Sequence, residues 1–313
     1  MGGESVIEVE GLRKHYKDIK AVDGISLSIP PKQIFSMLGA NGAGKTTTVE
    51  ILEGLRTPTA GSARVFGVDV TKDYSSIRAK VGILPQNFEP FDMLKPTEAI
   101  EYWAGLFNKK VARKDVLHLL ETVNLSHRKD VISKKLSGGE KRKLGIALSL
   151  VNEPELLFLD EPTTGLDPRA RRDLWGLIED IKKKGSTVFL TTHYLDEAEK
   201  LSDDVAIMHK GQIITKGSPE ELVRKHGKLT VIVLAGAGEV GLGEIKRRGI
   251  DATIEADGDV LVPVRDPTEM RQIFQKLSGI ELKVKDMYTR RQTLEDVFLS
   301  VVGQRMDEGV LGK

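Results

Sequence analysis

The feature that most constrains this chain is the glycine-rich stretch Gly39-Ala40-Asn41-Gly42-Ala43-Gly44-Lys45-Thr46-Thr47. An apolar run at 34–38 precedes it, and Val49, Leu52 and Leu55 follow it at helical spacing. This order of strand, glycine loop and helix, with the full spacing G-x-x-x-x-G-K-[ST], predicts a loop that binds phosphate. In such a loop, backbone N–H groups and a helix N-terminus face a single anion.

The residue types in the loop suit a nucleoside triphosphate. Glycines permit backbone geometries and a close approach that a Cβ would block. Lys45 is expected to reach the β- and γ-phosphates, the Thr46 hydroxyl to ligate Mg²⁺, and Thr47 to bond the α-phosphate. The plain alternative, a glycine turn before a helix that happens to carry a lysine, does not account for the matching strand and helix. The predicted nucleotide-binding residues of the loop are Gly39, Asn41, Gly42, Ala43, Gly44, Lys45, Thr46 and Thr47.

Composition narrows the kind of protein that carries this loop. A chain of 313 residues with 40% hydrophobic and 30% charged residues can form one large domain and a smaller companion, each with a core. A net charge of +1 gives no long-range attraction for nucleic acid, and the absence of cysteine excludes disulfides and thiolate metal sites. No apolar stretch approaches the roughly 18 residues of a spanning helix, and the first residues lack a signal-peptide core. We therefore expect any membrane role to depend on a partner.

An aromatic residue lies between the first two predicted strands, at 5–12 and 25–29. Tyr16 is either a surface aromatic in a loop or a face on which a nucleobase stacks. The phosphate loop favours base stacking.

Further along, the pattern changes from strands to helices. Strands are predicted at 62–66 and at 81–84, the second ending at Pro85-Gln86. Residues 89–134 are helical and polar, which predicts a subdomain outside the main sheet.

Leu136-Ser137-Gly138-Gly139-Glu140 then precedes an apolar helical repeat. Ser137 fits a helix N-cap, and the N-terminus of a helix can also bind an anion. The two roles do not exclude each other.

Two carboxylates end a continuous apolar run at 156–161. Such a run is typical of a strand buried on both faces of a parallel sheet, where ligands gather at the carboxyl ends of strands. Asp160 is placed to hold Mg²⁺, and Glu161 to orient or deprotonate the attacking water. The alternative is a strand that simply ends in acidic loop residues. His193 follows the next buried strand, 187–192. A histidine at such a place is more often structural or exposed, but a γ-phosphate would lie at the same position.

The remaining chain predicts a hairpin at 205–208 and 212–215, a helix that completes the first domain, and a second small domain. In the second domain we expect strands at 229–234, 252–255, 260–264 and 281–285, and helices at 267–277 and 294–302. Thr293 and Asp296 fit a capping box before the last helix, which has an apolar stripe.

The stretch Gly236–Gly241, with Glu255 about twenty residues on, matches a dinucleotide-binding spacing. Too little chain remains for a two-half Rossmann sheet, so we expect a loop joining two elements there.

Six segments occur in the usual order of one family: Tyr16, the loop 39–47, Gln86, the 136–140 signature, the run 156–161 and His193. In these segments, residues 4–222 resemble the nucleotide-binding domain of ATP-binding cassette (ABC) transporters. The signature is the discriminating segment, since phosphate loops occur in many nucleotidases. Glu140 departs from the frequent Gln, although Glu also occurs in members of the family. The ending 293–299 is similar to the tails of drug-exporter (ABC-2-type) subunits.

The resemblance implies an α/β P-loop NTPase fold with a mixed sheet core, an antiparallel β subdomain and a helical subdomain. The nucleotide-binding domain would span 1–225, with its helical subdomain at about 89–150. A small α+β accessory domain would span 226–313 and would aid dimerisation or regulation.

The resemblance also implies a mechanism in which two domains pair head to tail around two ATP molecules, and hydrolysis lets them part. ATP would be sandwiched between this loop and Ser137, Gly138 and Gly139 of the other domain. Asp167 would bridge the two sites. Mg²⁺ would be held by Thr46, Gln86 and Asp160. The implied catalytic residues are Lys45, Gln86, Glu161 and His193.

By the same resemblance the chain is the ATPase subunit of an exporter. Its partners would be a second ATPase chain, with a homodimer expected, and a separate transmembrane subunit. It would lie on the cytoplasmic face of the membrane, with the segment 86–91 at the coupling surface. Phe88 and Phe91 would be anchors there or would pack into the helical insert. The alternative is a soluble cassette ATPase acting on nucleic acid or ribosomes, but the tandem cassettes and basic arms usual in those proteins are absent from this sequence.

Overall fold

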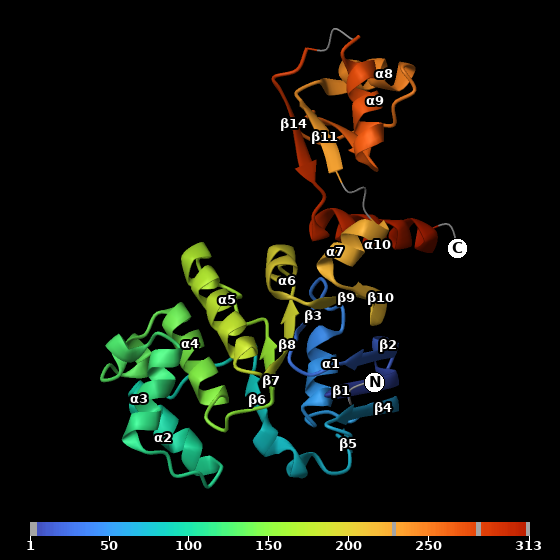
Figure 1. Ribbon diagram of the computed structural model, residues 1–313. Coiled ribbons are helices and arrows are strands. Elements are labelled where there is room, and N and C mark those ends of the chain that lie inside the picture. The colour runs from blue at the N-terminus through green and yellow to red at the C-terminus, as the bar shows by residue number, and fades with distance from the viewer. Residues whose placement is uncertain (1–4, 227–229, 280–282, 311–313) are drawn as a thin grey trace. The chain divides into compact units, whose positions relative to one another are not determined.

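The computed structural model describes residues 5–226, 230–279 and 283–310 (Figure 1). The chain divides into two compact units, Met1–Ser218 and Pro219–Lys313. Among the residues described, no helix has both the length and the apolar character needed to cross a bilayer.

A six-stranded sheet forms the centre of the first unit, with the strand order β10-β9-β3-β8-β7-β6. Its neighbouring strands are parallel except that β10 runs antiparallel to β9. The expected mixed sheet is therefore confirmed. Its strands are β3 (Ile34–Leu38), β6 (Val81–Leu84), β7 (Leu156–Asp160), β8 (Thr187–Thr192), β9 (Asp204–His209) and β10 (Gln212–Gly217).

The apolar run of β7 is buried along its whole length because alternate side chains enter two different cores. Phe158 packs on one face, with its ring centroid 5.5 Å from that of Phe189. Leu157 and Leu159 belong to the core on the other face. The strand is thus held from both sides, and this fixes the position of the carboxylates at its end.

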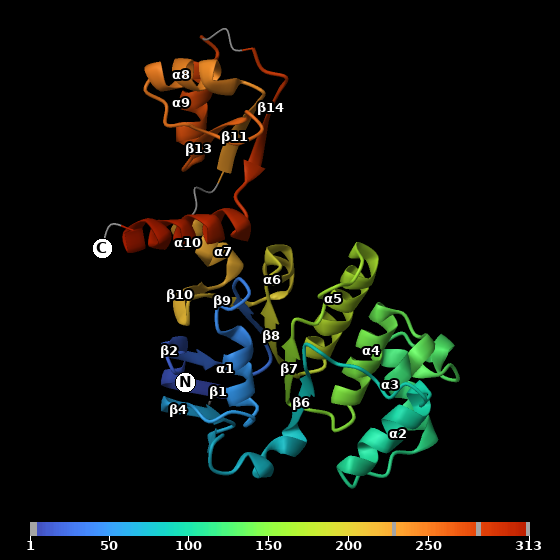
Figure 2. The ribbon, with the colours of Figure 1, turned by 180° about the vertical axis from the view of Figure 1, so that it is seen from behind.

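A second, antiparallel sheet of order β2-β1-β4-β5 covers one face of the first unit. Its strands are β1 (Ile7–Tyr16), β2 (Ile19–Ile29), β4 (Ala60–Val65) and β5 (Val68–Asp69). β1 and β2 are longer than predicted because their ladder continues to the tight turn, where Tyr16 pairs with Ile19. Both views show α1 (Lys45–Leu52) beside this sheet (Figure 1, Figure 2). Leu55, predicted on the apolar face of α1, lies beyond its end and is 69% exposed.

Helices cover the opposite face of the six-stranded sheet. Figure 1 shows α2, α3 and α4 grouped to one side of it as a helical insert. Leu144 of α4 and Leu177 of α5 lie in the same buried cluster as Leu157. Within the insert Trp103 packs on this cluster, whereas Leu106, the last residue of α2, is exposed. The helices are α2 (Pro96–Leu106), α3 (Arg113–Thr122), α4 (Gly138–Ser149), α5 (Pro168–Lys183) and α6 (Leu195–Leu201).

The second unit is built on an antiparallel sheet of order β12-β13-β11-β14. Its strands are β11 (Thr230–Ala235), β12 (Thr253–Ile254), β13 (Val260–Val264) and β14 (Asp286–Arg291). Ile232, Ile245 and Ile273 share its core, which joins the sheet to α8 and α9. The helices are α7 (Pro219–His226), α8 (Gly238–Arg247), α9 (Pro267–Leu277) and α10 (Leu294–Val310).

The second unit differs from the sequence-based expectation in two elements. Helix α7, expected to complete the first domain, packs on α10 and belongs to this unit, so the division falls after Ser218 rather than after residue 225. The prediction of a strand at 281–285 is wrong for residues 283–285, which are not in a strand. Residues 281 and 282 lie outside the described residues, and the strand itself is β14, which begins at Asp286 where pairing with β11 starts.

The last helix has the start that its sequence predicts. The Thr293 N–H and hydroxyl donate to Asp296 Oδ2 over 2.8 and 3.1 Å, and Leu294, Val297 and Val301 are buried.

In the stretch Gly236–Gly241, Gly236 and Ala237 connect β11 to α8, and Gly238 is already the first residue of the helix, so the stretch is not a simple loop. Because all pairings in this sheet are antiparallel, it lacks the parallel βαβ unit that a dinucleotide fold requires.

Candidate functional site

The phosphate loop passes so close to neighbouring backbone that two positions admit only glycine. A Cβ at Gly39 would lie 2.4 Å from the carbonyl oxygen of Met208, and a Cβ at Gly44 would lie 2.2 Å from that of Ala21. Gly44 also has φ +109°. No side chain caps α1, and its first turn contains no acidic residue. The N–H groups at its start are therefore available to an anion.

Lys45 is buried, with 4% of its surface exposed. Its Nζ donates to the carbonyl oxygens of Gly39 at 2.8 Å and Ala40 at 3.3 Å, and lies 3.2 Å from Glu161 Oε1. A buried ammonium needs such partners to offset the loss of water. The contacts hold Lys45 at the loop, next to the carboxylate that ends β7.

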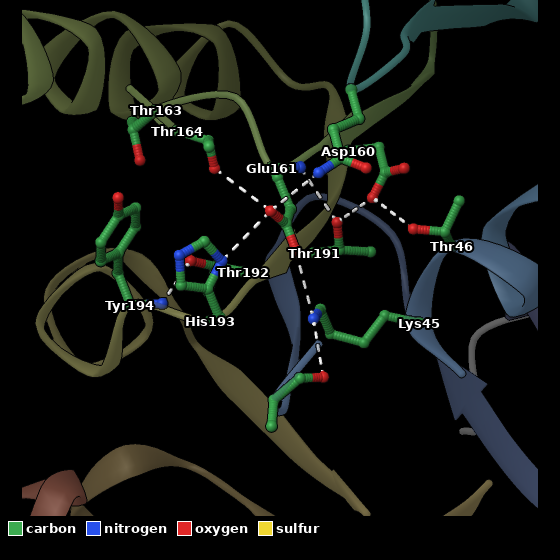
Figure 3. Close-up of polar contacts among 12 residues, drawn as sticks. Lys45, Thr46, Asp160, Glu161, Thr163, Thr164, Thr191, Thr192, His193 and Tyr194 are labelled. Atoms are coloured by element: carbon green, nitrogen blue, oxygen red, sulfur yellow. Dashed lines mark hydrogen bonds and ion pairs between the residues drawn. The ribbon is translucent and has the colours of Figure 1, made fainter. Parts of the chain in front are cut away.

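Glu161 is the centre of the site (Figure 3). It is 5% exposed, and its Oε2 accepts hydrogen bonds from Gln86 Nε2 at 3.1 Å and Thr164 Oγ1 at 3.2 Å. His193 Nδ1 lies 3.1 Å from the same oxygen. Burial alone would raise the pKa of Glu161, but Lys45 and His193 outweigh it, so the pKa is lowered. Glu161 is thus ionised at neutral pH, as a proton acceptor must be.

The backbone at Glu161 is unusual as well. Its φ of 46° lies in the left-handed region, which is costly for a residue with a Cβ. The local structure around the carboxylate over-determines this conformation, since both its backbone N–H and its side chain are bonded.

Asp160 faces the start of α1. Its Oδ1 accepts a hydrogen bond from Thr46 Oγ1 at 3.5 Å and a short one from Thr191 Oγ1. Thr191 Oγ1 in turn accepts the Glu161 N–H at 3.0 Å, so one hydroxyl links both carboxylate residues. Burial raises the pKa of Asp160. Sequence reasoning missed Thr191, although a polar residue inside the apolar run 187–192 was the available signal.

The oxygens of Thr46 and Asp160 suit Mg²⁺, which binds few protein ligands and completes its shell with water and phosphate oxygens. Within the described part of the chain, no group of three or more His, Asp or Glu side chains is arranged to hold a metal ion. This pair therefore fits an ion held largely by the nucleotide. Gln86, predicted as a third ligand, donates its amide to Glu161.

Arg142 of α4 is a member of the site that sequence reasoning missed. It is 8% exposed, and its guanidinium donates to the carbonyls of Pro85 at 3.0 Å, Gln86 at 2.6 Å and Glu161 at 3.3 Å. Burial lowers the pKa of Arg142, and the nearby carboxylates of Asp160, Glu89 and Glu161 oppose this shift. A basic residue on the inner face of the helix that follows the signature was the available signal.

The signature residues lie at the start of α4. The Ser137 side chain accepts the Glu140 N–H at 3.3 Å, and Glu140 Oε2 accepts the Ser137 N–H at 2.9 Å, a complete capping box. Burial would raise the pKa of Glu140, but Ser137 and Arg128, whose Nε lies 2.7 Å away, lower it to about 2. Ser137 and Gly138 are exposed, and among the described residues no hydrogen bond joins them to the phosphate loop.

Two other predicted residues have local roles in this chain. The Asp167 carboxylate caps α5 by accepting the N–H groups of Arg169 and Ala170 at 2.9 and 3.0 Å. Tyr16 is 37% exposed at the end of β1, with Lys14 Nζ 5.1 Å from its ring centroid. Stacking of a base on Tyr16 stays a prediction.

Of the two aromatic residues after Gln86, one is packed and one is exposed. Phe88 packs into the helical insert against Gly145. Phe91 is 45% exposed, with its ring 5.1 Å from that of Tyr102 in an edge-on arrangement. Met93 beside it is also exposed.

Residues 22–164 match the family model described as ABC transporter. The daunorubicin/doxorubicin resistance ATP-binding protein DrrA of Streptomyces peucetius is 36% identical over 310 residues, covering 96% of this chain and 94% of that protein. The Nod factor export ATP-binding protein I of Ralstonia nicotianae is 35% identical over 314 residues, covering 98% and 96%.

Solved structures match about 70% of the chain. An ATP binding subunit of an ABC transporter aligns with a TM-score of 0.63 and 27% identity over 71% of this chain and 93% of its own. The cbiO1 protein of Clostridium perfringens, part of the ABC transporter complex cbiONQ, aligns with a TM-score of 0.63 and 29% identity over 70% and 90%.

Proposed function

Because this chain belongs to the ABC transporter family of ATP-binding subunits, we propose specific roles for its residues in ATP hydrolysis and in subunit pairing. It is the ATP-binding subunit of an ABC exporter and an ATP hydrolase. The roles below concern how this chain performs that activity.

The observation that carries the proposal is the buried pair of Lys45 and Glu161, at 3.2 Å. A triphosphate in the loop offers Lys45 a stronger anionic partner than a single carboxylate. Lys45 then turns to the phosphates, and Glu161 is released to accept a proton from the attacking water. Gln86 and His193 both contact Glu161 Oε2 and orient this carboxylate. His193 would also contact the γ-phosphate.

Mg²⁺ would be held by Thr46 and Asp160, and when bound it neutralises part of the phosphate charge. Thr191 keeps the Asp160 carboxylate turned toward Thr46 by its hydrogen bond to Oδ1. Asn41, Gly42 and Ala43 supply backbone to the loop, and Thr47 lies in the first turn of α1.

We further propose that two copies pair head to tail, with Ser137, Gly138 and Gly139 of one copy facing the triphosphate of the other. The exposed N-terminus of α4 supports this, because it is a site suited to anions. The acidic Glu140 in its first turn is offset by Arg128. ATP contacts both copies only when they are closed, so it favours closure by that difference in affinity.

The transmembrane subunit would dock on the helical insert. Phe91 and Met93, just before α2, and Tyr102 of α2 expose apolar surface there. Docking would place the chain on the cytoplasmic face of the membrane, as a peripheral subunit. The transported compound would contact the transmembrane subunit, and the relatives named above differ in their cargo.

The second unit would help dimerisation or regulate opening. Because α7 belongs with α10, a truncation after Ser218 removes a complete unit, whereas one near Lys225 would leave α7 without α10. Unchanged ATPase activity and dimer formation after the cut at Ser218 would exclude both roles.

Glu161→Gln tests the mechanism. The amide cannot accept the proton, so turnover falls about 100-fold to 10,000-fold while MgATP binding persists. ATP is then not cleaved, and the dimer accumulates. Steady-state hydrolysis, a nucleotide-binding titration and size-exclusion chromatography with MgATP measure the three effects.

The matched control adds Ser137→Arg to the same variant. The bulky cation blocks the facing surface, and we expect MgATP binding without the dimer. Wild-type turnover in Glu161→Gln removes Glu161 from the mechanism, and a dimer that survives Ser137→Arg removes the head-to-tail arrangement.

A further inference from the structure

Glu197, in the first turn of α6, is a buried carboxyl for which the mechanism above has no use. None of its surface is exposed. Carboxyl groups are seldom fully buried without a cation, because burial without water or partners is costly. Here the partners are neutral donors. Burial raises the pKa of Glu197, and hydrogen bonds from Thr192, Thr163 and Trp175 act in the opposite direction.

The donors come from elements that surround the catalytic carboxylate. Thr163 Oγ1, on the loop two residues after Glu161, donates to Glu197 Oε1 at 2.8 Å. Trp175 Nε1 of α5 donates to the same oxygen at 2.9 Å. Thr192, which precedes His193, is the last residue of β8. One oxygen atom thus joins the loop after β7 to the helix that follows it.

The other carboxyl oxygen, Oε2, is buried as well, and the donors to this carboxyl are neutral. Burial of a carboxyl without a cation is costly, so the fold retains this group at a cost. A purely apolar side chain of similar size would avoid that cost but could not hold Thr163 and Trp175 together.

A second connection runs along the surface beside Glu197. Arg171 Nη2 of α5 lies 3.4 Å from Asp196 Oδ2, and its Cζ lies 4.8 Å from the ring centroid of Tyr194. The same Cζ is 5.7 Å from the Trp175 ring centroid. Helix α5 is therefore tied to the segment after β8 on two sides.

We propose that Glu197 is a positioning residue for ATP hydrolysis, which fixes the loop 161–167 against the His193 segment through Thr163 and Trp175. Glu161 begins the loop, next to Thr163 and Thr164 (Figure 3), and Asp167, the cap of α5, ends it. With Glu197 in place, Glu161, Asp167 and His193 keep fixed positions relative to one another. The inference rests on the roles proposed for Glu161 and His193.

Steady-state ATPase measurements on the full-length chain test this positioning. Glu197→Ala lowers kcat about 10-fold to 100-fold, because displacement of reacting groups by about 1 Å has effects of that size. The KM for MgATP stays within threefold, because Glu197 lies outside the phosphate loop. Glu197→Gln keeps the accepting oxygen and restores kcat to within about threefold of the parent. Thr163→Val keeps the shape, removes one donor, and lowers kcat by an intermediate factor.

Leu177→Ala is the control for a merely structural effect. Leu177 is a buried core residue of α5, the helix that carries Trp175. We expect it to lower the melting temperature at least as much as Glu197→Ala, with kcat kept within twofold of the parent.

Trp175 provides an optical readout of the same link. In a Trp103→Phe background it is the one tryptophan left of the two in the chain. MgATP is expected to change its emission in the parent and in Glu197→Gln, and to leave it unchanged in Glu197→Ala.

A Glu197→Ala protein with kcat within twofold of the parent would overturn the inference, as would Leu177→Ala losing as much kcat. The inference would also be overturned if the kcat of Glu197→Gln were as low as that of Glu197→Ala. The Glu161→Gln experiment is independent of these outcomes, so the proposed mechanism can stand when the role of Glu197 falls.

Discussion

The stretches Gly39–Thr47 and Gly236–Gly241 both follow a strand and both contain the start of a helix, α1 at Lys45 and α8 at Gly238. In the first, a Cβ at Gly44 would lie 2.2 Å from the backbone oxygen of Ala21. In the second, a Cβ at Gly238 would meet no atom within 4 Å, although φ is +64°. The first stretch is enclosed by neighbouring backbone, whereas the start of α8 at Gly238 is open.

The charges beside the two loops differ in the same way. Lys45 and Glu161 are 4% and 5% exposed, whereas Arg290 and Glu255, the acidic residue of the false dinucleotide pattern, are 37% and 41% exposed. A buried pair is strongly coupled to its surroundings, and an exposed pair is screened by water. Glycine spacing alone does not separate a nucleotide site from a turn; close backbone contact and buried charge do.

Gly44→Ala is expected to have the largest effect. The methyl group would meet a carbonyl oxygen and would impose a left-handed conformation on alanine. We expect a loss of about 2–5 kcal/mol in the free energy of unfolding, together with loss of MgATP binding. Urea unfolding and a nucleotide titration measure the two. A stable Gly44→Ala protein that binds MgATP normally would break the comparison.

Lys45→Met comes next. It leaves Glu161 buried with His193 as its remaining basic partner, at a cost of about 3–5 kcal/mol, and abolishes ATP hydrolysis. Arg290→Met is the matched control in the exposed pair and is expected to cost about 1 kcal/mol or less. Equal shifts in the melting temperatures of the two variants would contradict the distinction between buried and exposed pairs.

Glu53, at the end of α1, is a buried carboxyl next to the phosphate loop's helix, and its effect on stability depends on pH. Burial, with the charges of Asp160 and Glu50, raises the pKa of Glu53 from 4.5 to about 8. The folded protein therefore keeps this proton over a range in which the unfolded chain has lost it. In the protein without nucleotide, the contribution of Glu53 to the free energy of unfolding is complete below about pH 4.5. It falls as the pH rises toward 8, by on the order of 1 kcal/mol per pH unit. Glu53→Gln is expected to flatten this slope in urea unfolding from pH 5 to pH 8, and an unchanged slope would assign it to other groups.

Gly238→Ala is expected to have the smallest effect. The added methyl group enters open space, so the cost is the conformational one, about 1 kcal/mol. ATP hydrolysis stays within twofold of the parent. A tenfold loss of activity would mean that this turn takes part in the function of the first unit.

Local patterns were sufficient for the elements that hold the site. The runs of β6 and β8 were predicted with the observed ends, and that of β7 to within one residue, because each is a continuous apolar stretch between polar or turn residues. The phosphate loop was predicted for the same reason, since its function lies in backbone and in adjacent residues.

Contacts between distant segments were not predictable. Arg142 lies 56 residues from Gln86 in sequence, and only the fold brings its guanidinium to that carbonyl. Glu197 likewise meets Thr163 across 34 residues. The strand β14 was misplaced because its limits are set by pairing with β11 and not by its own pattern. Roles that need a second copy, such as that of Ser137, have no signature within one chain beyond the helix cap.

The left-handed backbone of Glu161 has a consequence for the engineering of such subunits. Glycine relaxes at that φ, so Glu161→Gly would relieve the backbone and would also remove the proton acceptor. The relaxed backbone would gain about 1–3 kcal/mol, but Lys45 would lose its buried anionic partner at a cost of about 3–5 kcal/mol. Selection for heat tolerance would therefore tend to retain the carboxylate that also serves turnover.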